Sequence, residues 1–153
     1  MPGNRQKSSG NKVEVLSTHL KEKEEKILQI LECINEEAAK GKPIIVEGKK
    51  DIAALKALAV EGKIITAKTG GKSLLELASE IERTGAKEVI LLLDFDRRGK
   101  ELTKNLKQHV EKAGIKMNMT FWSSLLGLVG KEVKDVEGLA AYMETLKSKI
   151  CNS

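Results

Sequence analysis

The chain has 153 residues, enough for one domain with a hydrophobic core and too few for two comfortable ones. No apolar run approaches the roughly 18 residues that a membrane span needs, and the polar start does not resemble a secretory signal. Two well-separated cysteines, Cys33 and Cys151, with no histidine near either, exclude a cysteine-based zinc site and fit a reducing compartment. We therefore expect a single soluble, cytoplasmic unit.

The net charge of +5 is concentrated at the N-terminus. Residues 1–12 contain Arg5, Lys7 and Lys12 and no acidic residue. A basic leader of this composition predicts a disordered tail over residues 1–12 that could attract a polyanion. Aromatic residues make up only 3% of the chain, which argues against a protein that holds single strands by stacking bases.

The first structured element is predicted to be a helix within residues 18–40. Its apolar side chains recur with the helical period, at Ile27, Ile30, Leu31, Ile34 and Ala38. Gly41 and Pro43 close the pattern, as expected at a helix end. We assign residues 13–42 to an N-terminal helical extension.

From Pro43 onward, short apolar runs alternate with stretches of helical period. The apolar runs are "PIIVEG", "KIITAK", "EVILLLDFD" and "KMNMTFW", and the helical stretches span residues 51–61, 73–83 and 99–113. Such alternation is typical of successive βαβ units with right-handed crossovers. We predict an α/β domain over residues 43–150, with a four-stranded, mainly parallel sheet and helices on both faces. A closing helix should cover the sheet with Val136, Leu139, Ala140, Met143 and Leu146.

Three carboxylates follow the first and third predicted strands. Glu47 ends the first run, and Asp94 and Asp96 end the third. Ligands of open parallel sheets bind beyond the carboxyl ends of the strands, so these side chains should converge if the two strands are neighbours. Crowded carboxylates raise one another's pKa and oppose folding, which a divalent cation would relieve. Oxygen ligands without histidine or thiolate favour Mg²⁺ or Mn²⁺.

A simpler interpretation is that Asp94 and Asp96 merely cap the following helix. One cap needs only one aspartate, however, and just four of the chain's 22 acidic residues are aspartates. That two of the four stand at this spacing favours the metal site. Asp51, in contrast, is expected to cap the helix that it opens.

Basic residues surround the same predicted edge of the sheet. The candidates for nucleic-acid binding are Lys49, Lys50, Lys72, Arg97, Arg98, Lys100, Lys104 and Lys107. Residues 97–116 hold seven basic and two acidic residues, and the buried stripe predicted for their helix is Leu102, Leu106, Val110 and Ala113. Such a face is often only solvated, but beside a metal site it would suit phosphate groups.

Two other enzyme classes share fragments of these motifs. "TAKTGGKS" approaches the P-loop pattern, but Thr66 stands where the first glycine is required, so Gly70 and Gly71 are better explained as a turn. Haloacid-dehalogenase-type phosphatases also end a strand in two spaced aspartates, but they need threonine where this chain has Arg98. Asp135, the one later aspartate, is expected to be a helix cap.

Taken in order, these motifs resemble the Toprim domain of bacterial-type primases, topoisomerases and related nucleases. The matching residues are Glu47 and Gly48 after the first strand, Gly70 and Gly71 in the second turn, and Asp94, Asp96 and Gly99 after the third strand. The resemblance covers about residues 43–122 and implies a Rossmann-like fold. It also implies that Glu47 acts as general acid or base and helps Asp94 and Asp96 to hold Mg²⁺ or Mn²⁺ during phosphodiester chemistry.

The resemblance leaves two classes of function open. In outline the chain is most similar to the Toprim part of the nuclease that matures 5S ribosomal RNA, which favours a metal-dependent enzyme acting on RNA rather than DNA. The alternative is a module that keeps the metal site and binds a nucleic acid or a ribonucleoprotein without cutting it. The intact carboxylates favour the enzyme, while the absence of a separate substrate-binding domain favours the module.

Overall fold

The computed structural model describes the backbone of residues 2–152 and the side chains of residues 18–152. Its sheet has four parallel strands in the order β2-β1-β3-β4. The strands are β1 (Ile44–Val46), β2 (Ile64–Thr66), β3 (Glu88–Leu91) and β4 (Lys116–Asn118). The predicted α/β fold with a parallel sheet is confirmed. The backbone of residues 2–12, where the sequence predicts a disordered tail, is helical. The side chains of these residues lie outside the described ones, so the attraction of a polyanion to them stays a prediction.

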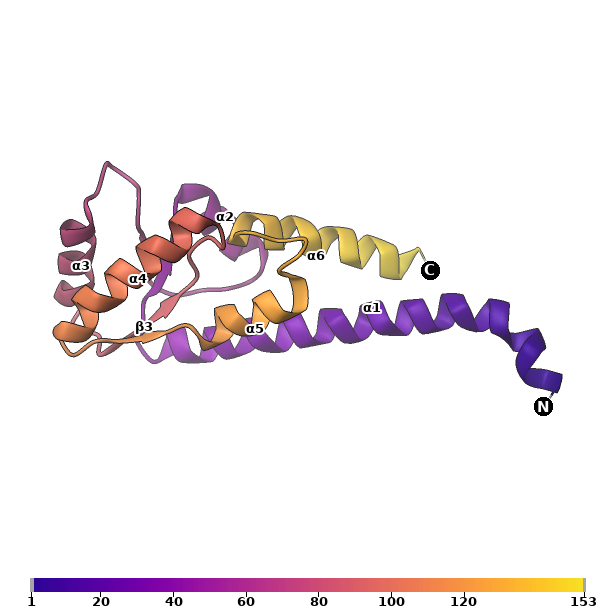
Figure 1. Ribbon diagram of the computed structural model, residues 1–153. Helices are drawn as coiled ribbons and strands as arrows, with labels where there is room; N and C mark the ends of the chain where they lie inside the picture. The colour runs from indigo at the N-terminus through magenta and orange to yellow at the C-terminus, as the bar shows by residue number, and fades with distance from the viewer. Residues whose placement is uncertain (1, 153) are drawn as a thin grey trace.

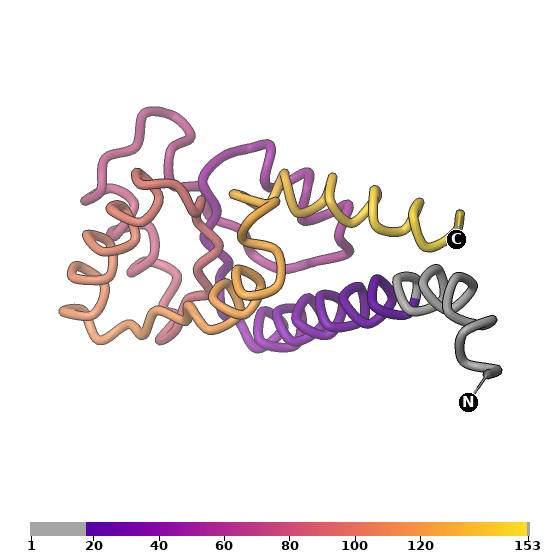
Figure 2. Tube along the Cα trace, turned by 45° about the vertical axis from the view of Figure 1, so that its right-hand side comes forward, coloured from indigo at the N-terminus to yellow at the C-terminus, as the bar shows by residue number. Residues whose placement is uncertain are grey.

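Helices cover both faces of the sheet, as Figure 1 shows. They are α1 (Pro2–Ala39), α2 (Lys49–Ala57), α3 (Leu74–Arg83), α4 (Arg97–Lys112), α5 (Thr120–Val129) and α6 (Val136–Cys151). Helices α3 and α4 pack on one face, whereas α1, α2, α5 and α6 share the other. In both Figure 1 and Figure 2, α1 and α6 run alongside each other away from the sheet.

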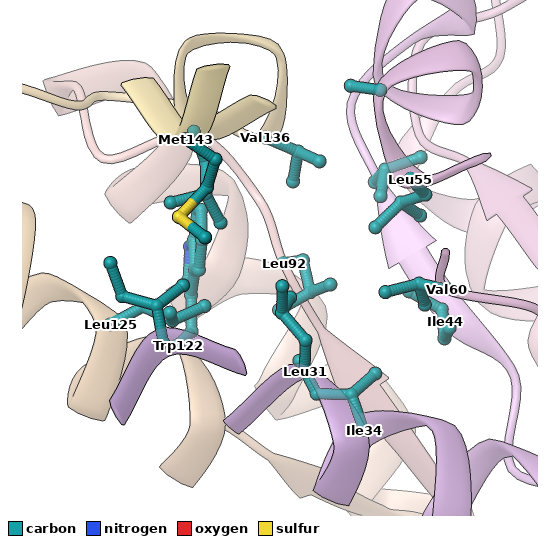
Figure 3. Packing of buried hydrophobic residues seen from close by; sticks show 14 of the residues in the cluster. Leu31, Ile34, Ile44, Leu55, Val60, Leu92, Trp122, Leu125, Val136 and Met143 are labelled. Carbon is teal, nitrogen blue, oxygen red and sulfur yellow. The ribbon is translucent and has the colours of Figure 1, made fainter. Parts of the chain in front are cut away.

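The two cores follow from the alternation of side chains along each strand. Ile44 and Val46 of β1 point into the core under α1, α2, α5 and α6, whereas Ile45 between them points into the core under α3 and α4. Since both faces are buried, the central strands are apolar apart from Glu88 at the start of β3, as parallel strands usually are. Figure 3 shows the larger core, in which Leu92 lies between Leu31 of α1 and the side chains from α5 and α6.

Helix α1 belongs to the larger core rather than lying loosely on the domain. Its buried stripe is Ile27, Leu31, Ile34 and Ala38, close to the stripe expected from the sequence. Leu28, beside this stripe on the same helix, is 43% exposed. Within the described residues, none of the helices is long and apolar enough to cross a membrane.

Helix α5 was not expected from the sequence. The sequence pattern predicts one apolar run over "KMNMTFW", but the strand ends at Asn118 and a helix begins at Thr120. The side chain of Asn118 accepts a hydrogen bond from the backbone N–H of Thr120 at 3.0 Å, which turns the chain into the helix. Short apolar runs do not distinguish strand from helix by periodicity, which explains the error.

The buried stripe of α4 is shorter than expected from the sequence, because Ala113 is the exposed C-cap of this helix.

We expect Ile34→Ala to lower the free energy of unfolding by about 2–5 kcal/mol, because it opens a cavity in a fully buried part of the core. Leu28→Ala in the same helix is the matched control and should cost less than about 1 kcal/mol. Urea denaturation followed by circular dichroism measures both. Equal losses in the two variants would show that α1 does not pack as described.

Candidate functional site

The carboxyl ends of β1 and β3 bring two acidic residues together. The backbone N–H of Leu92 donates to the carbonyl of Ile45 at 2.8 Å, which extends the pairing of the two strands up to the edge of the sheet. Glu47 follows β1 and is 9% exposed, and Asp94 lies two residues after Leu92 and is half-buried. The predicted convergence of Glu47 with Asp94 is therefore present in the structure.

The two carboxyl groups are incompletely satisfied. Among the described residues, Glu47 Oε2 and Asp94 Oδ1 are the buried side-chain oxygens that lack a hydrogen-bond partner. Ionised carboxylates can only accept hydrogen bonds, so a shared proton or a cation is needed to satisfy both oxygens. Burial, together with the neighbouring carboxyl of Glu47, raises the pKa of Asp94 from 3.8 to about 8, and Asp51 and Asp135 add to the effect.

Lys68 supplies a positive charge to this pair. Its ammonium forms an ion pair with Glu47 Oε1, and its backbone N–H donates to the Glu47 carbonyl at 3.0 Å. The side chain is half exposed, whereas that of Glu47 is nearly buried. Lys68 was not among the residues expected from the sequence, because a lone lysine in a turn carries no recognisable spacing.

Asp96 has a different position from Asp94. It is the N-cap of α4, and its Oδ1 accepts a hydrogen bond from the backbone N–H of Gly99 at 2.7 Å. The capping interpretation therefore holds for Asp96, while Asp94 faces Glu47. Whether Asp96 also contributes to metal binding stays a prediction.

Gly99 is required by the close approach of the chain to Asp94. A Cβ atom at position 99 would lie 2.0 Å from the carbonyl oxygen of Asp94. Such a contact is far inside the van der Waals distance and involves a backbone atom that cannot rotate away. The glycine of the DxDxxG motif thus permits the tight turn that carries both aspartates. In the second turn, Gly70 and Gly71 have φ values of +78° and +68°, which favour glycine.

The start of α6, which lies outside the sequence motifs, contacts the site through Asp51. Asp51 is the third residue of α2, not its N-cap, which is Gly48. The Asp51 carboxylate accepts from the N–H of Gly48 at 3.1 Å and from that of Glu137 at 3.3 Å. Burial raises the pKa of Asp51. The expected capping of α6 by Asp135 is confirmed, so all four aspartates of the chain lie in this region.

Helix α5 supports the turn between the two aspartates of the motif. The ring of Phe95 stacks on Trp122 with ring centroids 3.9 Å apart, and the Trp122 indole N–H donates to the carbonyl of Leu93. The backbone N–H of Phe95 donates to the Lys134 carbonyl at 2.6 Å. The turn that carries Asp94 is thus held by packing on one side and by the segment before α6 on the other.

The predicted basic residues are mostly exposed around this edge. Those on the first turns of α2 and α4 and along α4 are Lys49, Lys50, Arg97, Arg98, Lys100, Lys104 and Lys107. Lys72 differs, because its ammonium donates to the Thr66 carbonyl at 2.7 Å and to Glu80 at 2.6 Å. Lys72 therefore fixes the turn between β2 and α3, and a role for it in nucleic-acid binding stays a prediction.

The donor set fits a hard divalent cation in part. Carboxylate oxygens are the ligands that Mg²⁺ and Mn²⁺ prefer, and two of them lack partners. Among the described residues, however, no three acidic, histidine or cysteine side chains are arranged to hold a metal. Glu47 and Asp94 would hold such an ion together with water or substrate oxygens, as is usual for Mg²⁺.

Comparison with known proteins agrees with this geometry. Residues 42–122 match the Toprim domain, a class whose acidic residues generally bind Mg²⁺ and whose functions are related to nucleic acids. The chain is 42% identical to a UPF0292 protein of Methanocaldococcus jannaschii over 78% of its own length and 91% of the relative. It is 38% identical to a UPF0292 protein of Methanosarcina acetivorans, over 82% and 85% of the two chains. The chain therefore belongs to the Toprim domain family and, within it, to the UPF0292 proteins.

A solved structure supports the fold alone. A putative protein from Aquifex aeolicus superposes with a TM-score of 0.58 at 23% identity, covering 71% of this chain and 94% of its own.

We expect Gly99→Ala to destabilise the protein by about 3 kcal/mol or more, since the new methyl group would clash with the Asp94 backbone. Gly127→Ala in α5 is the matched control, because a Cβ there meets nothing within 4 Å. It should stabilise the helix by up to about 1 kcal/mol. Thermal unfolding of both variants is the measurement, and a Gly99→Ala protein as stable as the wild type would contradict the described turn.

The raised pKa of Asp94 predicts a stability that depends on pH. The folded protein holds this proton up to about pH 8, whereas the unfolded chain loses it near pH 3.8. The stability contributed by the proton is therefore lost as the pH rises between these values. In EDTA, the wild type should lose on the order of 1 kcal/mol between pH 6 and pH 9, after discounting for solvent access.

Asp94→Asn should remove most of that loss, because the amide has no proton to release. Urea denaturation at the two pH values measures the difference. If the free energy of unfolding falls with pH by the same amount in the variant and the wild type, Asp94 is not the cause of the pH dependence.

Proposed function

We propose that this protein is a divalent-cation-dependent enzyme that acts on phosphodiester bonds of nucleic acid, with RNA as the favoured substrate. The observation that carries the proposal is the pairing of Glu47 with Asp94 at the carboxyl edge of the sheet, each with a buried oxygen lacking a partner. Structural ion pairs normally satisfy their buried oxygens. An unsatisfied pair next to an exposed basic helix suits a cation and a phosphate.

Each group then has a role that follows from its position. Asp94, with Asp96 beside it, would hold Mg²⁺ or Mn²⁺ at the end of β3, and Glu47 would complete the site and transfer a proton. The cation, when bound, supplies electrostatic stabilisation of charge on the phosphate. Lys100, Lys104 and Lys107 on α4 would bind the phosphates that flank the reacting one.

A non-catalytic binding module is the second candidate. Two observations favour it: Asp96 is engaged as the N-cap of α4, and no metal-holding group of three acidic side chains is present in the described part of the chain. In this case the same edge would bind a nucleic acid or a ribonucleoprotein, and the cation would only strengthen that binding. The two candidates share the surface and differ in whether a bond is broken.

Cleavage of a labelled hairpin RNA and a labelled DNA duplex in Mg²⁺ separates the candidates. We expect the RNA to be cut, and Glu47→Gln to lower the rate by about 10²- to 10⁴-fold with nearly unchanged affinity, because the amide keeps its shape but cannot transfer a proton. Reversal of Lys104 and Lys107 to glutamate should weaken binding and reduce the slope of log affinity against log salt by about two.

Reversal of Lys56 and Lys63, which are exposed elsewhere on the domain, controls for the change in net charge. If the wild type cuts neither probe but binds one, and only the reversal on α4 weakens that binding, the binding module is correct. If Glu47→Gln cuts as fast as the wild type, Glu47 is not the general acid or base.

A further inference from the structure

The two carboxylate oxygens of Glu47 have different surroundings. Oε1 is paired with the ammonium of Lys68, while Oε2 is buried without a hydrogen-bond partner. A buried carboxylate is costly unless a positive charge or hydrogen bonds compensate it. Asp94, whose raised pKa keeps it protonated up to about pH 8, supplies no positive charge. Lys68 is therefore the positive charge that is paired with Glu47 in the protein without a metal.

The side chain of Lys68 can move away from Glu47 while the backbone of Lys68 stays hydrogen-bonded in place. The backbone N–H of Lys68 donates to the Glu47 carbonyl, and that of Ala67 donates to Val46 at 2.8 Å, so both continue the pairing of β2 with β1. The side chain itself is half exposed, so it can rotate into solvent without disturbing either core. Lys72, by contrast, is fixed by its bonds to Thr66 and Glu80.

The ammonium and a divalent cation would share one carboxylate, that of Glu47. A divalent cation held by Glu47 and Asp94 would use carboxylate oxygens as ligands. An ammonium in contact with Glu47 would then face an ion of the same sign at close range, in a site partly shielded from water. Binding of one cation to the Glu47 carboxylate therefore weakens binding of the other.

We propose that Lys68 is a built-in counter-cation of Glu47 that a divalent ion displaces, and that it thereby sets the affinity of the site for the ion. This inference rests on the proposed cation site. In the metal-free protein, the ion pair with Lys68 holds the Glu47 carboxylate in place. When the ion binds, the ammonium is released at the edge of the sheet, and its pairing energy with Glu47 is subtracted from the binding energy of the metal.

Calorimetric titration with Mn²⁺ tests the competition. Lys68→Gln should bind Mn²⁺ about two- to fivefold more tightly than the wild type, the range expected for losing one partly exposed ion pair. Lys68→Arg keeps the charge and should bind like the wild type. Lys56→Gln removes an exposed lysine from the last turn of α2 and should also leave the affinity unchanged, which controls for net charge.

Chemical acetylation followed by mass spectrometry gives a second readout that does not depend on affinity. Lys68 of the wild type should react slowly in EDTA and faster after Mn²⁺ is added, while Lys56 reacts equally in both. Glu47→Gln should make Lys68 reactive even in EDTA, because its partner has lost its charge.

The outcomes separate this inference from the proposed function. If the wild type binds Mn²⁺, Asp94→Asn weakens that binding, and Lys68→Gln changes nothing, the cation site stands and the role of Lys68 is wrong. If Asp94→Asn binds Mn²⁺ as tightly as the wild type, the cation site lies elsewhere and the proposed function fails. If neither the wild type nor Lys68→Gln binds Mn²⁺, both are wrong.

Discussion

The parallel pairing of β1 with β3 is the constraint on which the candidate site depends. The pairing aligns the carboxyl ends of two buried strands, so Glu47 and Asp94 meet with little freedom to move apart. In most proteins this arrangement would be avoided, because two buried carboxyl groups oppose each other's ionisation. Here the sheet imposes it. Lys68 forms an ion pair with Glu47, and the raised pKa of Asp94 lets that carboxyl group keep its proton instead of carrying a second negative charge. The site is also suited to a cation.

The parts that hold this arrangement come from well beyond the matched Toprim region. That region ends at residue 122. Beyond it, the Lys134 carbonyl accepts a hydrogen bond from the backbone N–H of Phe95, and the backbone N–H of Glu137 donates to the Asp51 carboxylate. Trp122, the last residue matched, packs in the larger core beside α1 and α6. The N-terminal and C-terminal helices thus share a core with the helix that supports the site. They are therefore part of its framework.

The electrostatic design of the edge is consistent with a polyanionic partner. Helix α4 begins at the aspartate motif and carries exposed lysines along its outer side, so acidic and basic groups lie in adjacent positions. A phosphate near the cation could contact both. Under the proposed function, the exposed lysines would govern association and the buried Glu47 would govern the chemistry at the bound phosphate.

The sequence alone determined the fold class and the approximate site, because periodicity and strand-end motifs are local properties. Apolar runs of strand length between helical stretches required a parallel sheet, and Glu47 with Asp94 and Asp96 marked its carboxyl edge. Only the tertiary structure assigned the individual roles. Asp94 and Asp96 are equivalent in the motif, but the direction of the turn aims one at Glu47 and makes the other a cap. Lys68, Trp122 and Glu137 act across contacts between segments distant in sequence, and such contacts exist only once the chain has packed.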